Sequence, residues 1–122
     1  MENREYGNIK ISEDVIATIA SLAASEIDGV ASMSGGITGN ITEILGKKNL
    51  SKGVKVVVNE DEVFIDLFVL IEYGFVIPDV AWKIQENIKN TVETMAGLKV
   101  SEVNVHIQGV NFKKEKTEEN NQ

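Results

Sequence analysis

The stretch from Val63 to Tyr73 alternates in side-chain direction as a long β-strand does. One side of this strand is apolar throughout and carries Val63, Ile65, Leu67, Val69, Ile71 and Tyr73. The opposite side carries Phe64, Asp66, Phe68, Leu70 and Glu72. We expect helices to cover the apolar side of a two-layer domain and the mixed side to face water.

Other stretches of the sequence predict the elements around this strand. Strands are expected at 7–11, 54–58 and 100–108, residues 30–33 are extended, and 59–62 form a turn. A first helix follows the N-cap Ser12 and ends at Gly29, with a core stripe of Val15, Ile16, Ile19, Leu22, Ala23 and Ile27. A second helix runs from Pro78 to Gly97, with a core stripe of Val80, Ile84, Ile88, Val92 and Met95.

These elements define an α+β fold in which two helices cover one face of a mixed sheet, in the order β-α-(β)-loop-β-β-α-β. The last strand, helix and strand should form a right-handed parallel crossover. The length of 122 residues suits one domain, which we place at 7–112. We expect flexible polar tails at 1–6 and 113–122 and a mobile glycine-rich loop at 34–53.

Composition excludes several classes of function. There is no cysteine, and His106 is the single histidine, so thiolate sites, disulfides and imidazole-rich zinc sites are ruled out. The net charge of −7 opposes binding to DNA and to anionic lipid. The first residues lack the apolar region of an export signal, and no run of about 18 apolar residues could insert into a membrane. We therefore expect a cytoplasmic protein.

Catalytic patterns are missing from the sequence. Ser32 and Ser34 lie near Gly35 but do not form the G-x-S-x-G motif of a nucleophile elbow. His106 is expected on the polar side of its strand, without a positioned acidic partner. We predict a protein that is not an enzyme and that needs no cofactor or metal.

A second function is weighed because Gly36-Ile37-Thr38-Gly39 is a formal GxxG sequence. KH domains clamp a nucleic-acid backbone with such a loop, so a KH-like RNA-binding domain is the alternative reading. No Lys or Arg lies between Lys10 and Lys47, however, so this loop carries no positive charge to attract phosphate.

The mixed side of the long strand suggests a contact surface, because Phe64, Phe68 and Leu70 form an apolar patch on it. Either another chain covers this patch, or the loop at 34–53 folds over it with Ile37, Ile41, Ile44 and Leu45. Trp82, at the border of the second helix's polar side, is a possible second anchor or a rim residue. Ala17, Ser21 and Ala24 are either exposed helix formers or a close contact for a helix of another chain.

Two long stretches of the chain are similar to a known family. Residues 77–88 (IPDVAWKIQENI) and 92–110 (VETMAGLKVSEVNVHIQGV) resemble the C-terminal signature of the alkaline-shock-protein (Asp/Gls-type) family of envelope stress response proteins. Residues 15–30 and 33–36 are similar to the N-terminal half of that family, so the resemblance spans about 7–112.

The resemblance implies a small cytoplasmic protein of Gram-positive bacteria that acts in cell-envelope homeostasis and has no catalytic residues. It implies a homo-oligomer that reaches the membrane through a separate membrane-anchor protein. Some members of the family are encoded beside a fatty-acid-kinase-like protein, which is a second implied partner. From these observations we predict an oligomerising scaffold protein that is recruited to the membrane through a partner.

Overall fold

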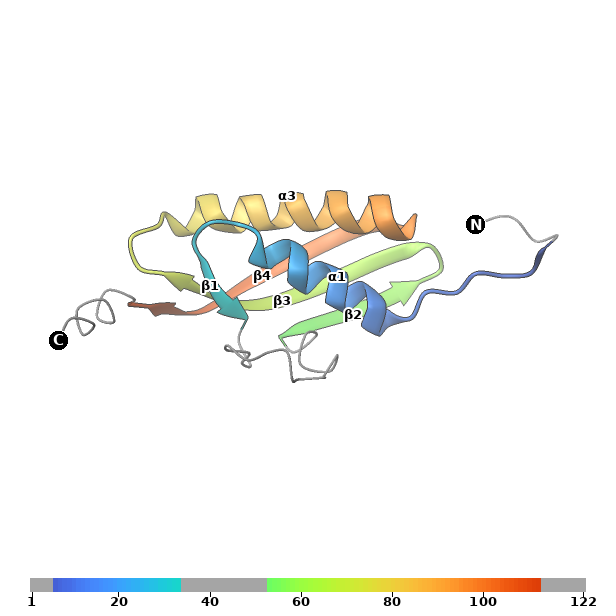
Figure 1. Cartoon of the computed structure of the whole chain (residues 1–122), viewed down its shortest axis with the longest axis horizontal. Helices are drawn as coiled ribbons and strands as arrows, with labels where there is room; N and C mark the ends of the chain where they lie inside the picture. Colours follow the sequence, from blue (N-terminus) through green and yellow to red (C-terminus); the bar gives the residue numbers. More distant parts are fainter. Residues whose placement is uncertain (1–5, 34–52, 113–122) are drawn as a thin grey trace.

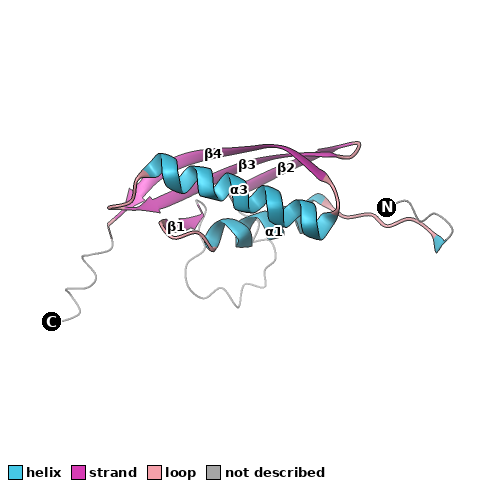
Figure 2. Ribbon diagram, turned by 90° about the horizontal axis from the view of Figure 1, so that it is seen from above, coloured by secondary structure: helices cyan, strands magenta, loops and turns pink. Residues whose placement is uncertain are grey.

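The computed structural model describes residues 6–33 and 53–112. The elements are α1 (Glu13–Ser25), β1 (Val30–Met33), β2 (Val54–Asn59), β3 (Glu62–Glu72), α3 (Ile77–Ala96) and β4 (Lys99–Asn111). Both helices lie against the same face of the sheet, as Figure 1 shows, and Figure 2 gives the same two layers from above. The predicted two-layer α+β fold is confirmed.

Strand β3 is the centre of a mixed sheet. β4 pairs with it in parallel along its whole length, from Glu62 opposite Lys99 to Glu72 opposite Asn111. β1 and β2 both pair antiparallel with β3, β2 along its first half and β1 along its second. Because β4 occupies one edge of β3, the strands β1 and β2 share the other edge end to end. The predicted parallel pairing across β3, α3 and β4 is confirmed.

The core lies between the sheet and the helices. The core-facing residues of β3 are completely buried: Val63, Ile65, Leu67, Val69 and Ile71. Helix α3 covers them with Val80, Ile84, Ile88, Val92 and Ala96. Two predicted core residues are wrong, because Tyr73 is 64% and Met95 66% exposed. β3 ends at Glu72, so Tyr73 lies in the following turn, where its ring and that of Phe112 form a T-shaped contact.

The buried face of α1 is made mostly of small residues, namely Ile16, Ala17, Ala20, Ser21, Ala23 and Ala24. Val15 and Leu22 are about half exposed, so their predicted place in the core is wrong. Burial also contradicts the predicted exposure of Ala17, Ser21 and Ala24, and a helix of another chain cannot reach residues already buried in this one.

The reason is that α1 and α3 contact each other side by side on the sheet. Small side chains let two helices approach closely, and the side-chain amide of Asn87 on α3 donates a hydrogen bond to the carbonyl oxygen of Ala23 at 2.8 Å. The face of α1 that fits against a neighbouring helix is therefore its smallest face rather than its most hydrophobic one.

The ends of the elements follow the sequence with two exceptions. Ser12 caps α1, Pro78 lies in the first turn of α3, and Gly97 ends α3 with a left-handed φ of 73°, as predicted. Residues 7–11 form no strand, so that prediction is wrong. Gly29 does not end α1, because the C-cap is Glu26. Gly29 lies instead in the turn into β1, where it adopts a φ of 103°.

Candidate protein interaction surface

The side of the sheet that faces away from the helices is called the open face here. Among the described residues it carries Phe64, Asp66, Phe68 and Leu70 from β3, Lys55 and Val57 from β2, and Glu102, Asn104 and His106 from β4. The strict alternation along β3 separates these side chains from the core. Both helices lie on the opposite side, so neither covers the open face (Figure 2).

An apolar row, interrupted by Asp66, runs along the middle of the open face. Val57 on β2 lies opposite Phe64 and is 57% exposed, whereas Phe64, Phe68 and Leu70 are partly buried. Leu70 packs over Gly109 of β4, where an added Cβ would lie 3.2 Å from Leu70 Cδ2. The absence of a side chain at Gly109 thus gives Leu70 room to lie across the strand.

Phe68 and His106 are opposite each other in the parallel pairing of β3 and β4. Their rings are stacked, with centroids 4.5 Å apart and planes at 11°. His106 Nε2 lies 3.2 Å from Asp66 Oδ1, and both side chains are more than 40% exposed, so water weakens this pair. The stacked ring of Phe68 and the carboxylate of Asp66 together hold the ring of His106 beside the apolar row.

His106 is the residue of this surface that sequence reasoning missed. The sequence places it on the polar side of β4 but offers no partner, because Asp66 and Phe68 are about 40 residues away in the chain. Only the parallel register brings them together. The combination of an apolar row with polar side chains around it is typical of the core and rim of a protein–protein interface.

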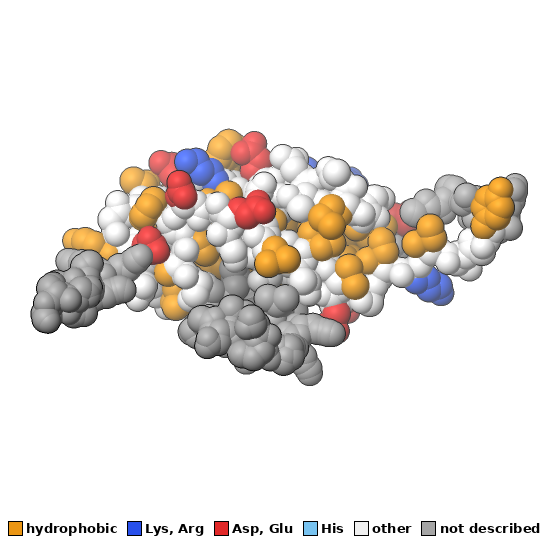
Figure 3. All heavy atoms as spheres, in the orientation of Figure 1, with side chains coloured by type: hydrophobic (Ala, Val, Ile, Leu, Met, Phe, Trp, Pro, Cys, Tyr) orange, Lys and Arg blue, Asp and Glu red, His pale blue; other side chains and the backbone are white. Residues whose placement is uncertain are grey.

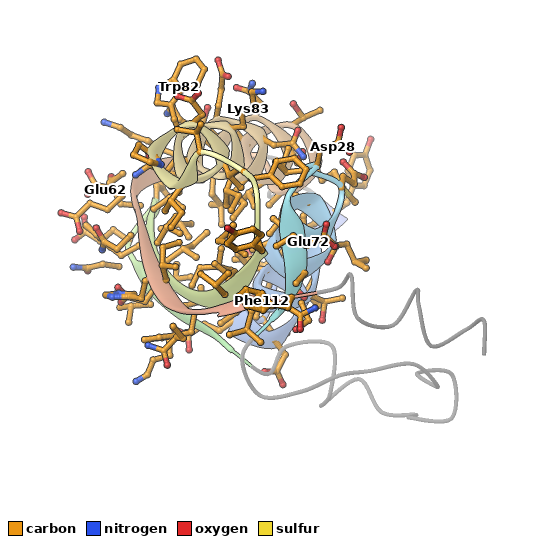
Figure 4. All side chains as sticks on the ribbon, turned by 90° about the vertical axis from the view of Figure 1, so that its left-hand side faces the viewer. Asp28, Glu62, Glu72, Trp82, Lys83 and Phe112 are labelled. Atoms are coloured by element: carbon orange, nitrogen blue, oxygen red, sulfur yellow. The ribbon has the colours of Figure 1, made fainter. Side chains whose placement is uncertain are left out.

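Trp82 does not join the open face. Its side chain is 58% exposed and points outward from α3, on the helical side of the molecule (Figure 4). The two predicted anchors, Trp82 and the row around Phe68, therefore lie on opposite sides of the sheet. Other apolar side chains on the helical side include Val15 and Leu22, and Figure 3 shows hydrophobic atoms over α1.

Several predictions concern residues outside the described ranges. The GxxG sequence at Gly36–Gly39, the candidate Ser34 and the apolar loop residues proposed to cover the open face all lie within 34–52. The predicted tails, apart from Tyr6, lie outside these ranges as well.

The described ranges 6–33 and 53–112 hold neither a metal-binding cluster nor a membrane-spanning helix. These residues contain no cluster of three or more His, Asp or Glu side chains that could hold a metal ion. None of the helices in these ranges has both the length and the apolar character needed to cross a membrane.

Comparisons with known proteins place the chain in a family. A family model matches residues 1–112, that of the alkaline shock protein 23 family, which is described as having a cell envelope-related function. The chain is 42% identical to the uncharacterized protein YqhY of Bacillus subtilis over 111 residues, which cover 91% of this chain and 82% of YqhY. It is 40% identical to YloU of the same species, over 87% of this chain and 90% of YloU.

A more distant relative is a stress response regulator gls24 homolog of Streptococcus pyogenes, 28% identical over 89% of this chain and 62% of that protein. No solved structure matches the chain significantly. The family match covers nearly all of the chain, and it agrees with the resemblance of residues 7–112 noted from the sequence. The chain therefore belongs to the alkaline shock protein 23 family, whose function is related to the cell envelope.

Proposed function

We propose that this protein is a non-enzymatic scaffold of the cell-envelope stress response that associates with further copies of itself through the open face. In this proposal the apolar row of Val57, Phe64, Phe68 and Leu70 becomes the buried centre of a contact between copies. The surrounding polar side chains, among them Asp66 and His106, form its rim.

The open face is the observation that carries this proposal. Two aromatic side chains and a leucine lie on a sheet surface that neither α1 nor α3 covers. Apolar side chains that remain partly exposed on a sheet surface mark interaction sites on soluble proteins, and aromatic residues are enriched among interface anchors. The role in stress is supported by the gls24 homologs, which are named as stress response regulators.

The second part of the proposal is that the assembly reaches the membrane through a partner protein. The net charge of −7 opposes direct attraction to the anionic cytoplasmic face of a membrane. A membrane-anchor protein of the kind that the family resemblance implies would supply that contact. A fatty-acid-kinase-like protein is the other partner proposed on the same ground.

The test is the substitution Phe68→Asp, with mass measured by light scattering over a concentration series. A charge in the centre of the contact should weaken self-association by about 30-fold, or ~2 kcal/mol, as expected for a central anchor. Circular dichroism and a thermal melt show whether the variant remains folded. Phe64→Ser, which adds no charge, is the second variant should Phe68→Asp unfold.

Leu22→Asp is the matched control, because Leu22 is half exposed on the helical side of the molecule. It introduces the same charge at an apolar position and should leave association unchanged. A wild-type protein that stays monomeric at every concentration contradicts the proposal. A loss of association with Leu22→Asp but not with Phe68→Asp contradicts it as well, since the contact would then be on the helices.

A further inference from the structure

Strand β4 forms an outer edge of the sheet, and the two halves of its free edge differ. Among the described strands β4 pairs with β3 alone, and Figure 2 shows it as the outermost of these strands on that side. Alternate peptide groups of an edge strand point away from the sheet, where they need another hydrogen-bond partner. For β4, the partners of these outward peptide groups differ between its first and second halves.

Side chains of α3 provide the hydrogen-bond partners in the first half of the edge. The backbone N–H of Val100 donates to Glu93 Oε2 at 2.9 Å, and Lys89 Nζ donates to the carbonyl oxygen of Val100 at 3.3 Å. Gln85 Nε2 donates to the carbonyl oxygen of Val103 at 3.0 Å. These three α3 residues are spaced four apart, so they form one row along the side of the helix that faces β4.

This row ends before the second half of the edge. The next position in the row is Ala81, whose side chain has no polar atom. Because the peptide groups of alternate residues point the same way along a strand, those of Val105 and Ile107 point outward like that of Val103. No side chain of the described residues forms a hydrogen bond with them.

The second half of the edge also lacks the features that prevent strand addition. Natural edge strands are blocked by charges, above all lysine, or by proline. Residues 103–112 (VNVHIQGVNF) contain no Asp, Glu, Lys, Arg or Pro, although a quarter of the whole chain is charged. The irregularity between the pairs at Val69 and Leu70 interrupts this edge only beyond Ile107.

The core-facing side chains of this half are not completely covered. Leu67 and Val69 of β3 are 0% exposed, while their partners on β4, Val105 and Ile107, are only partly buried. An additional strand beside β4 would bring apolar side chains next to Val105 and Ile107 and would complete their burial. An additional strand would therefore satisfy both the outward peptide groups and the partly exposed apolar side chains of this half.

We propose that the second half of the β4 edge pairs antiparallel with the same segment of a second copy, across a two-fold axis near 105–107. This inference rests on the self-association in the proposed function and adds a second contact, separate from the open face. A second copy fits because a two-fold contact sets each segment against itself. A charged segment would then face its own charge, whereas this segment contains no Asp, Glu, Lys or Arg.

Amide hydrogen exchange measured by NMR on the full chain tests the pairing. In the dilute monomer, the N–H groups of Val105 and Ile107 should exchange fast, because nothing in the described structure protects them. In the concentrated, associated protein both should become protected by roughly tenfold or more, as strand hydrogen bonds form. The N–H of Val100, bonded to Glu93, serves as an internal reference that should change little.

Gln108→Lys is the corresponding variant, because Gln108 is exposed within the segment and lies outside the apolar row. With the axis at 106, position 108 lies opposite position 104 of the second copy. Combining this change with Asn104→Lys, also at an exposed position, therefore sets lysines opposite each other and should weaken association by roughly tenfold. Asn90→Lys, exposed on α3, is the control for the added charge and should leave association unchanged.

Different results separate this inference from the proposed function. An associating protein whose Val105 and Ile107 exchange equally fast at all concentrations overturns the edge pairing and leaves the open-face contact standing. Full protection in the dilute monomer also overturns the pairing, because the chain itself would then cover the edge. A protein that never associates overturns both.

Discussion

At the scale of single residues, Gly29 occupies the most demanding position in the described chain. Its φ of 103° is one that other residues rarely adopt. An added Cβ would also lie 2.9 Å from Phe75 Cδ2 and 2.9 Å from Val80 Cγ2, which is closer than van der Waals contact allows. Gly29 thus lets the link between α1 and β1 pass tightly against the start of α3.

The substitution Gly29→Ala should therefore lower the free energy of unfolding by about 2–5 kcal/mol, as backbone strain and overpacking add. Gly74→Ala is the matched control, because Gly74 has a φ of 102° but nothing within 4 Å of its added Cβ. It should show the backbone cost alone, about 1–2 kcal/mol. Urea unfolding of both variants measures the difference, and equal losses would show that the crowding at Gly29 relaxes freely.

At the scale of elements, the junction between α3 and β4 depends on Glu93. Its carboxylate accepts hydrogen bonds from Lys89 Nζ and from the backbone N–H of Val100, each at 2.9 Å. These hydrogen bonds lower the pKa of Glu93 below its ordinary value of 4.5, and the bond from Lys89 has a larger effect than the bond from Val100. Ionised Glu93 therefore stabilises the fold at pH values above its ordinary pKa. This contribution is lost as the pH falls through the lowered pKa of the folded protein.

The variant Glu93→Gln should have a lower Tm than the wild type at neutral pH. This difference should shrink as the pH falls from the ordinary pKa of a glutamate through the lowered pKa of Glu93, because the wild-type carboxylate becomes protonated and loses its ionic bonds. Thermal melts of both proteins between pH 7 and pH 3 measure it. Because the Glu93 side chain is 34% exposed, water screens its charge and the effect should be modest. A Tm difference that stays constant across this range would show that the charge of Glu93 is not involved.

The strands β2, β3 and β4 and the helix α3 could be predicted from the sequence because their patterns permit one arrangement. Alternation along β3 divides its residues into a core side and an open side, and Pro78 and Gly97 mark the ends of α3. The open-face candidates Phe64, Phe68 and Leu70 were found for the same reason. The stack of His106 on Phe68 was not, because a strand pattern contains no information about the register between strands.

Helix α1 shows why a hydrophobic stripe can mislead. It has apolar residues on more than one side, and the largest ones, such as Val15 and Leu22, suggested the wrong face. The choice of face depends on the space between α1 and α3, which is a property of the folded molecule. A separate sign was present in the sequence, since Ala17, Ala20, Ala23 and Ala24 form a continuous small surface suited to a close helix contact.

At the scale of the whole molecule, net charge opposes assembly. Each copy carries −7, so copies repel one another while the proposed contacts are largely apolar. Raising the salt concentration from about 20 to about 200 mM NaCl should therefore strengthen self-association, since it screens the repulsion and leaves apolar burial intact. Sedimentation velocity measures the change. Dissociation by salt would indicate that ion pairs between copies dominate the contact.

Two distinct contacts on one chain have a geometric consequence for the assembly. A two-fold contact through the β4 edge alone would stop at a dimer. If the open face also joins copies in pairs, each dimer has surfaces left for further dimers, and the assembly can extend without a fixed end. A scaffold with this property would grow with concentration, and the concentration series in the light-scattering experiment would show a mass that does not level off at two copies.

The shared edge of β3 has one more consequence. Met33, the last residue of β1, lies opposite Val69, and Val54, the first residue of β2, lies opposite Leu67. The two positions are thus about 7 Å apart, at about 3.4 Å per residue along the neighbouring strand. β1 and β2 therefore follow each other along β3 in the same direction, as one strand with an insertion in its middle would. Because loop length adds little to the free-energy cost of closing a loop, we expect the sheet to tolerate a tag grafted between Met33 and Val54, or a chain opened there by circular permutation.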